Sequence, residues 1–306
     1  MALTLYDLVY QLAKKLGIVT VEGAQTGSSS TTVIRDSIWL SQGDDYWNGG
    51  TVFALDTGGA APERQFAIVS DFADTNNELT HGGFSAALAP GGLYAVARAT
   101  YPLPILISKI NSAIRRLGPV EFVDIGGIQI AAETREYAVT LSGSPSPIRK
   151  VLDVWMQGKD TSDSDVGTVD FRDYEWERVT EWETWFEEPL NQSNDVGLRL
   201  MFPRQLPEGR YLAVRVEGLH PSLSIYSQVV YLPVPVERVV AEAAVECLEW
   251  YDFRHKGGDK TVNNLLTLMR QEAAQLAQRY PIRQKGGVQL AQLGEGLGVG
   301  DGWGGW

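Results

Sequence analysis

The chain has 306 residues, of which 44% are hydrophobic and 21% charged, so its composition is that of a folded protein rather than a disordered one. Its 38 acidic residues against 26 basic ones give a net charge of −12, which argues against a protein that grips nucleic acid or an anionic membrane by charge. A single cysteine, Cys247, excludes an intrachain disulfide and a cysteine-based metal cluster.

The first residues lack a basic segment followed by an apolar one, and no run approaches about eighteen apolar residues. We therefore expect a chain that is made in the cytoplasm, is not exported and does not enter a membrane.

The first predicted helix covers residues 4–16. Thr4 and Asp7 have capping-box spacing, leucines and Val9 share one helical face, and Gly17 ends the run. From residue 23 the chain changes to short β-prone runs separated by glycine pairs, which predicts a small β-barrel-like module over 23–100.

Helical periodicity returns over 102–117, which begins at a first-turn proline. Residues 120–232 are strand-like again, which predicts a larger β domain, a second sheet or sandwich. Its six expected strands cover residues 137–141, 151–156, 175–186, 198–202, 211–216 and 229–232.

Two closing helices are predicted over 235–257 and 260–280, with apolar stripes that must each be buried against a partner. As partners we expect the helices at 4–16 and 102–117. The fold class is therefore α+β: a helical bundle formed by residues 1–22, 101–119 and 233–281, with the small β module inserted at 23–100 and the β domain at 120–232.

Residues 282–306 form a glycine-rich segment that should be an extended, flexible arm, because glycine loses the most backbone entropy on ordering. Two tryptophans at its end are more than a solvated linker needs, since a buried aromatic contributes roughly 2–3 kcal/mol. We expect the arm to order on a partner through its apolar residues, Leu290, Leu293, Leu297, Trp303 and Trp306, although an idle tail is the simpler alternative.

No nucleotide, zinc-protease or serine-hydrolase motif occurs in a usable context, so the sequence predicts neither an enzyme nor a cofactor or metal site. Cys247 falls on an apolar helix face, where it should be buried. The three histidines lie in predicted turns and should be solvated: His81, His220 and His255.

The run from Tyr174 to Glu188 combines carboxylates with three tryptophans. Read as strands, it places aromatic residues on one face and acidic ones on the other: Glu175, Glu177, Glu181, Glu183 and Glu187. Three interpretations stay open: a solvated acidic face over an aromatic core, a glycosidase-like carboxylate pair, and an anionic wall along a DNA channel to which DNA does not stick.

One segment carries a family resemblance. It reads Asp44-Asp45-Tyr46-Trp47-Asn48-Gly49-Gly50-Thr51-Val52-Phe53, then Arg64 to Phe72, then Glu78-Leu79-Thr80. This resembles a module of tailed-phage virion proteins, with Glu-Leu-Thr where the family has a Thr-Leu-Thr-like strand. The order of expected elements likewise resembles phage head-to-tail adaptor proteins.

The resemblance implies a structural protein of the virion neck that forms a homo-oligomeric ring, typically of about twelve copies. Its implied partners are its own copies, the portal protein, a tail or nozzle protein and passing DNA that it does not bind specifically. Two alternatives stay open, a capsid decoration or cement protein and a carbohydrate-binding tail or receptor module.

Overall fold

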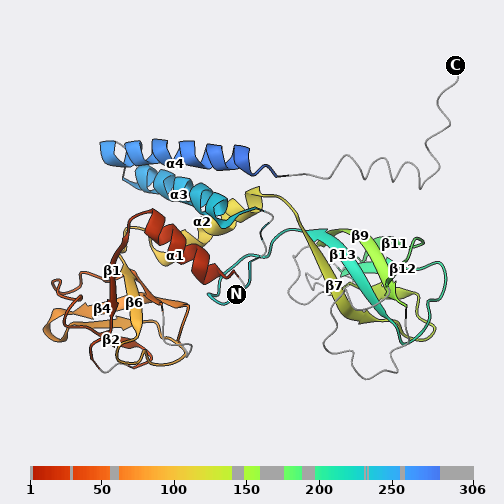
Figure 1. Cartoon of the computed structure of the whole chain (residues 1–306), viewed down its shortest axis with the longest axis horizontal. Helices are drawn as coiled ribbons and strands as arrows, with labels where there is room; N and C mark the ends of the chain where they lie inside the picture. The colour runs from red at the N-terminus through yellow and green to blue at the C-terminus, as the bar shows by residue number, and fades with distance from the viewer. Residues whose placement is uncertain are drawn as a thin grey trace, which may run out of the picture. The chain divides into compact units, whose positions relative to one another are not determined.

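The computed structural model describes residues 3–27, 30–55, 62–139, 148–158, 176–187, 197–230, 232, 234–255 and 259–282 (Figure 1). The chain divides into two compact units. The mixed unit is built from Tyr6–Ala113 and the described residues from Leu232 onward, and the sandwich unit from Met1–Leu5 and Ile114–Tyr231.

The four α-helices of the described chain lie where the apolar stripes predict them: α1 (Leu5–Lys15), α2 (Leu103–Arg116), α3 (Val236–Arg254) and α4 (Lys260–Arg279). α3 and α4 pack against each other (Figure 1). Asp259 caps α4, because its carboxylate accepts hydrogen bonds from the N–H groups of Thr261 and Val262. α3 buries three alanines, which allow neighbouring helices to approach closely.

The mixed unit contains a six-stranded antiparallel sheet in the order β1-β6-β3-β4-β5-β2. Its strands are β1 (Val19–Ala24), β2 (Val33–Arg35), β3 (Thr51–Ala54), β4 (Gln65–Ala73), β5 (Glu78–His81) and β6 (Leu93–Ala97). β4 pairs with β3 through residues 65–68 and with β5 from Val69 onward, and a bulge shifts the register of the β4–β5 pair between Val69 and Asp71.

The sheet encloses a core in which Trp47, Phe72 and Tyr94 are fully buried. α1 packs on this sheet rather than on helices alone. The Tyr6 ring meets Phe53 of β3 edge-on, and the Tyr6 hydroxyl donates to the Ala54 carbonyl at 3.0 Å. Its apolar stripe therefore has a strand as one of its partners.

The sandwich unit contains two further sheets. The four-stranded sheet has the order β10-β9-β13-β7 and the three-stranded sheet the order β11-β12-β8. Their strands are β7 (Val120–Gln129), β8 (Glu136–Ala138), β9 (Ile148–Gln157), β10 (Trp176–Arg178), β11 (Glu183–Glu187), β12 (Gly197–Met201) and β13 (Tyr211–Gly218). One continuous core takes side chains from both sheets, including Val154, Leu200 and Val214.

The predicted fold class, a helical bundle with a small β insert, is wrong. The described chain is mostly β-sheet, with three sheets, one of them a half-barrel, and four helices. The prediction failed because an apolar helical stripe shows that a partner exists but not whether that partner is a helix or a sheet.

Two details of the strand prediction also change. β7 was not expected, because Asp124 and two glycines interrupt its alternation. The strand expected at 229–232 contributes only an isolated bridge between Thr4 and Val229 among the residues described there.

Candidate functional site

Residues 44–50, which carry part of the family resemblance and which we call the polar turn, are held in one conformation by packing and hydrogen bonds. Trp47 is 1% exposed, and its indole N–H donates to the Gln42 side chain at 3.0 Å. Gly49 has a positive φ of 76°, and a Cβ on Gly50 would collide with the backbone oxygen of Ala97 in β6. The Trp-x-Gly-Gly pattern thus fixes how β3 leaves the turn and contributes no reactive group.

The arginine that precedes β4 fixes the module to α1. Arg64 has a φ of 57°, and its guanidinium forms an ion pair with the carboxylate of Asp7. Both side chains are about one-fifth exposed. The second part of the pattern is therefore also explained by packing.

Four exposed aspartates surround the polar turn, and we call them the acidic rim: Asp44, Asp45, Asp71 and Asp74. The Asp74 N–H donates to the Asp44 carboxylate at 3.4 Å, and the Asp45 N–H donates to the Phe72 carbonyl at 2.9 Å. These bonds hold the turn beside the end of β4. Among the described residues, no group of three or more His, Cys, Asp or Glu is arranged to hold a metal ion.

The acidic run does not form the single strand face that the sequence predicts. Glu177 lies on β10 in the four-stranded sheet, whereas Glu183 lies on β11 in the three-stranded sheet, and both are exposed. Glu181, between the two strands, is exposed and lies 3.5 Å from Arg204. Glu175 lies outside the described residues, and Glu187 belongs to β11 but its side chain is not described.

The aromatic residues of the same run have different environments. Trp182 is partly buried against the core of the sandwich unit, as expected for the reverse of an acidic face. Trp185, in contrast, is 38% exposed and lies opposite Arg199 in the pairing of β11 with β12. Trp185 is thus a tryptophan available at the surface.

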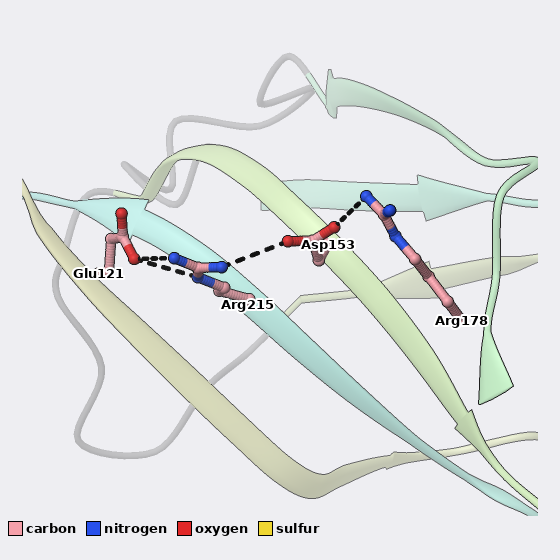
Figure 2. A network of polar contacts seen from close by, with 4 residues as sticks. All are labelled: Glu121, Asp153, Arg178 and Arg215. Atoms are coloured by element: carbon pink, nitrogen blue, oxygen red, sulfur yellow. Dashed lines mark hydrogen bonds and ion pairs between the residues drawn. The ribbon is translucent and has the colours of Figure 1, made fainter. Parts of the chain in front are cut away.

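A charged ladder that the sequence did not predict crosses the four-stranded sheet. Figure 2 shows its members, one from each strand: Glu121 (β7), Arg215 (β13), Asp153 (β9) and Arg178 (β10). The Arg215 guanidinium binds Glu121 through Nε at 3.1 Å and reaches Asp153 Oδ2 at 3.5 Å. Arg178 Nη2 donates to Asp153 Oδ1 at 2.5 Å.

The charged ladder alternates in sign and is neutral as a whole. Both oxygens of Asp153 are engaged by arginines, so this carboxylate is not a free base for catalysis. The available signal was a lone charge inside an apolar strand, as in Val214-Arg215-Val216. It could not be used without knowing which strands pair.

Two histidines predicted to be solvated are buried instead: His81 is 3% and His220 5% exposed. Burial lowers the pKa of His81 to about 4 and also lowers the pKa of His220. The expected burial of Cys247 is confirmed, and burial raises the pKa of its thiol to about 12. These groups are unsuited to proton transfer or nucleophilic attack near neutral pH.

The residues predicted to anchor the C-terminal arm lie outside the described residues: Leu290, Leu293, Leu297, Trp303 and Trp306. No helix of the described chain is both long and apolar enough to cross a membrane. A comparison with protein-family models finds no family that matches the chain, and a comparison with curated proteins finds no significant match.

Proposed function

We propose that this chain is a structural protein of a tailed-phage virion, a head-to-tail adaptor that assembles into a ring, docks onto the portal and surrounds the DNA channel. The observation that carries the proposal is the residue pattern from Asp44 to Thr80, which resembles a module of such virion proteins. In the structure this pattern forms a tightly packed turn and a strand pairing, and this packing supports a structural role for the module.

The distribution of charge supports a channel that DNA traverses without adhering. The chain carries −12, and exposed carboxylates occur on both units, in the acidic rim and at Glu177 and Glu183. A ring multiplies this charge by its copy number, and a wall of the same sign as the phosphate backbone disfavours contact. The acidic rim becomes a second candidate for the channel wall beside the predicted glutamates.

The docking test uses the C-terminal arm. The full chain is mixed with portal rings of the phage that encodes it, and the bound fraction is measured by co-sedimentation. Replacing both Trp303 and Trp306 by alanine should weaken docking by about 30-fold or more, because one buried aromatic contributes roughly 2–3 kcal/mol.

Trp185→Ala is the matched control, since it removes an exposed tryptophan outside the arm. It should leave docking unchanged. Equal docking by the full chain and the double arm variant would contradict a portal-binding arm, and loss of docking only in the Trp185 variant would place the contact on β11.

Glycan binding is the second candidate function, because the exposed Trp185 on β11 is a surface on which a sugar ring can stack. A glycan array probed with the full chain and with Trp185→Ala distinguishes the adaptor function from glycan binding. The adaptor proposal expects no binding by either protein, whereas binding that Trp185→Ala abolishes would favour the receptor role.

A further inference from the structure

One arginine is buried near the start of α3. Arg238 is 8% exposed and is the only lysine or arginine that is buried among the described residues. Its Nε donates to the Glu242 carboxylate at 2.9 Å, one helical turn further along, and the Glu242 side chain is 15% exposed. Both ions of a buried pair lose their hydration, so the pair by itself does not explain why the charge is there.

The place of Arg238 within α3 is unfavourable for a cation. α3 begins at Val236, so Arg238 lies in its first turn. The N-terminal end of a helix carries a partial positive charge, which stabilises anions and disfavours cations. Glu237 in the same turn follows this rule, whereas Arg238 breaks it at a buried position. A residue that breaks a local rule is expected to serve something beyond its own element.

The second contact of the Arg238 side chain lies at the end of α4. Its Nη1 donates to the backbone carbonyl of Tyr280, the residue that caps the last turn of α4. Carbonyl groups at a helix C-terminus lack partners within the helix and carry a partial negative charge, so a guanidinium is favoured there. Arg238 is therefore poorly placed for its own helix and well placed for the end of the neighbouring one.

Further contacts arrange the chain at this end of the helix pair. The Tyr280 N–H donates to the Leu276 carbonyl at 2.9 Å, and the Arg279 guanidinium lies over the Tyr280 ring, 5.3 Å from its centre. The Arg238 N–H donates to the Pro235 carbonyl at 3.1 Å. Arg238 thus joins the residue at which the chain enters α3 to the residue at which it leaves α4.

We infer that Arg238 is a positioning residue that holds the end of α4 and so fixes the point from which the C-terminal arm leaves the helix pair. We call its contact with the Tyr280 carbonyl the Arg238 clamp. The effect of the clamp on docking rests on the proposed function. An arm that starts at a fixed point loses less freedom on binding and keeps its anchors at a higher effective concentration than one that starts in a frayed helix.

Hydrogen exchange tests the Arg238 clamp without a portal. Exchange is followed by mass spectrometry in a peptide that covers residues 274–282. The wild type is compared with Arg238→Met combined with Glu242→Gln, which we call the clamp variant; the second substitution avoids a buried carboxylate without its cation. The matched control, Arg270→Met, removes an exposed pair between the same two helices, Arg270 with Glu249 at 2.8 Å.

The wild type and the control should exchange the last turn of α4 slowly, and the clamp variant at least about tenfold faster, while peptides from α2 stay unchanged. Equal exchange in the wild type and the clamp variant would overturn the inference. If the clamp variant does not fold, Arg238→Lys replaces it, because lysine keeps the cation but lacks the fork that reaches both acceptors. Faster exchange of the last turn then supports the clamp, and unchanged exchange overturns it.

The docking assay connects the clamp to the arm. With portal rings, the clamp variant should need at least about threefold more protein for half-binding, and Arg270→Met should match the wild type. When Trp303 and Trp306 are already alanine, the clamp substitutions should cause no further loss, because a residue that acts through the arm has no anchors left to position. The same loss with and without the two tryptophans, or equal docking despite faster exchange, would contradict the positioning role.

The clamp and the adaptor function fail separately. Faster exchange in the clamp variant without portal docking by any of the proteins would remove the adaptor function and leave the clamp. Equal docking of the wild type and the clamp variant, with equal exchange, would remove the clamp and leave the adaptor function.

Discussion

Two histidines that the sequence places in turns are enclosed in the structure, and His81 carries the larger consequence. Its Nδ1 accepts a hydrogen bond from the Gly83 N–H at 3.2 Å, and its ring lies against Phe84. Its pKa falls from 6.5 to about 4 because burial disfavours the cation. Protonation therefore opposes folding.

This shift predicts an acid-dependent loss of stability. The unfolded chain binds a proton near pH 6.5 and the folded chain only near pH 4, so the free energy of unfolding falls as the pH drops through that window. His81→Asn keeps an acceptor for Gly83 and cannot titrate. Urea unfolding at pH 7 and 4.5 should show the wild type losing about 2 kcal/mol more than this variant. An equal loss of stability in both proteins would contradict a contribution of His81 to the acid dependence.

The glycines of the polar turn give a second prediction at the same scale. Gly49→Ala meets only the cost of a positive φ, about 1 kcal/mol, because its Cβ has 3.5 Å to the nearest atom. Gly50→Ala pushes a Cβ into the backbone of β6 and should cost about 3 kcal/mol or more. Thermal unfolding of the two variants measures the difference in their stability. Similar melting temperatures would contradict the close packing of Gly50 against β6.

At the scale of elements, the charged ladder shows how the four strands of one sheet are held in register. Arg215 lies opposite Asp153 in the pairing of β13 with β9 and is 28% exposed, whereas Arg178 at the edge is 60% exposed. The central arginine holds two carboxylates and the terminal one holds only one.

Arg215→Ala should therefore destabilise the sandwich unit by about 1–2 kcal/mol, since it leaves Glu121 and Asp153 without their shared cation. Arg178→Ala should cost at most about 0.5 kcal/mol, because an exposed pair is screened by water. Denaturant unfolding at low and high salt measures the free energy of unfolding of the two variants. A larger loss of stability for Arg178→Ala than for Arg215→Ala would contradict the central role of Arg215 in the charged ladder.

The elements differ in how far the sequence determined them. The helices were predictable because each carries its own apolar stripe, as in α2, where Leu106 and Ile110 are fully buried. Strand partners were not, because pairing depends on residues distant in the chain. The acidic run shows this best: its first strand pairs with β9 and its second with β12, so one predicted face became two.

At the scale of the whole molecule, the same limit explains the error in fold class and the candidate sites. Burial of Cys247 followed from a helical stripe, but burial of His81 depends on loops packed around it. The polar turn was recognisable from its residues, but the close approach of Gly50 to β6 could be seen only in the structure. The charge balance was predictable from composition, whereas the charged ladder could be found only once the pairing of the strands was known.

The copy number of this chain in purified virions tests the adaptor proposal most directly. Quantitative mass spectrometry against the portal protein, with labelled peptides of both as standards, measures it. A single closed ring predicts about a dozen copies per particle. Hundreds of copies would indicate a cement protein on the capsid surface, and absence from the particle would remove the virion assignment.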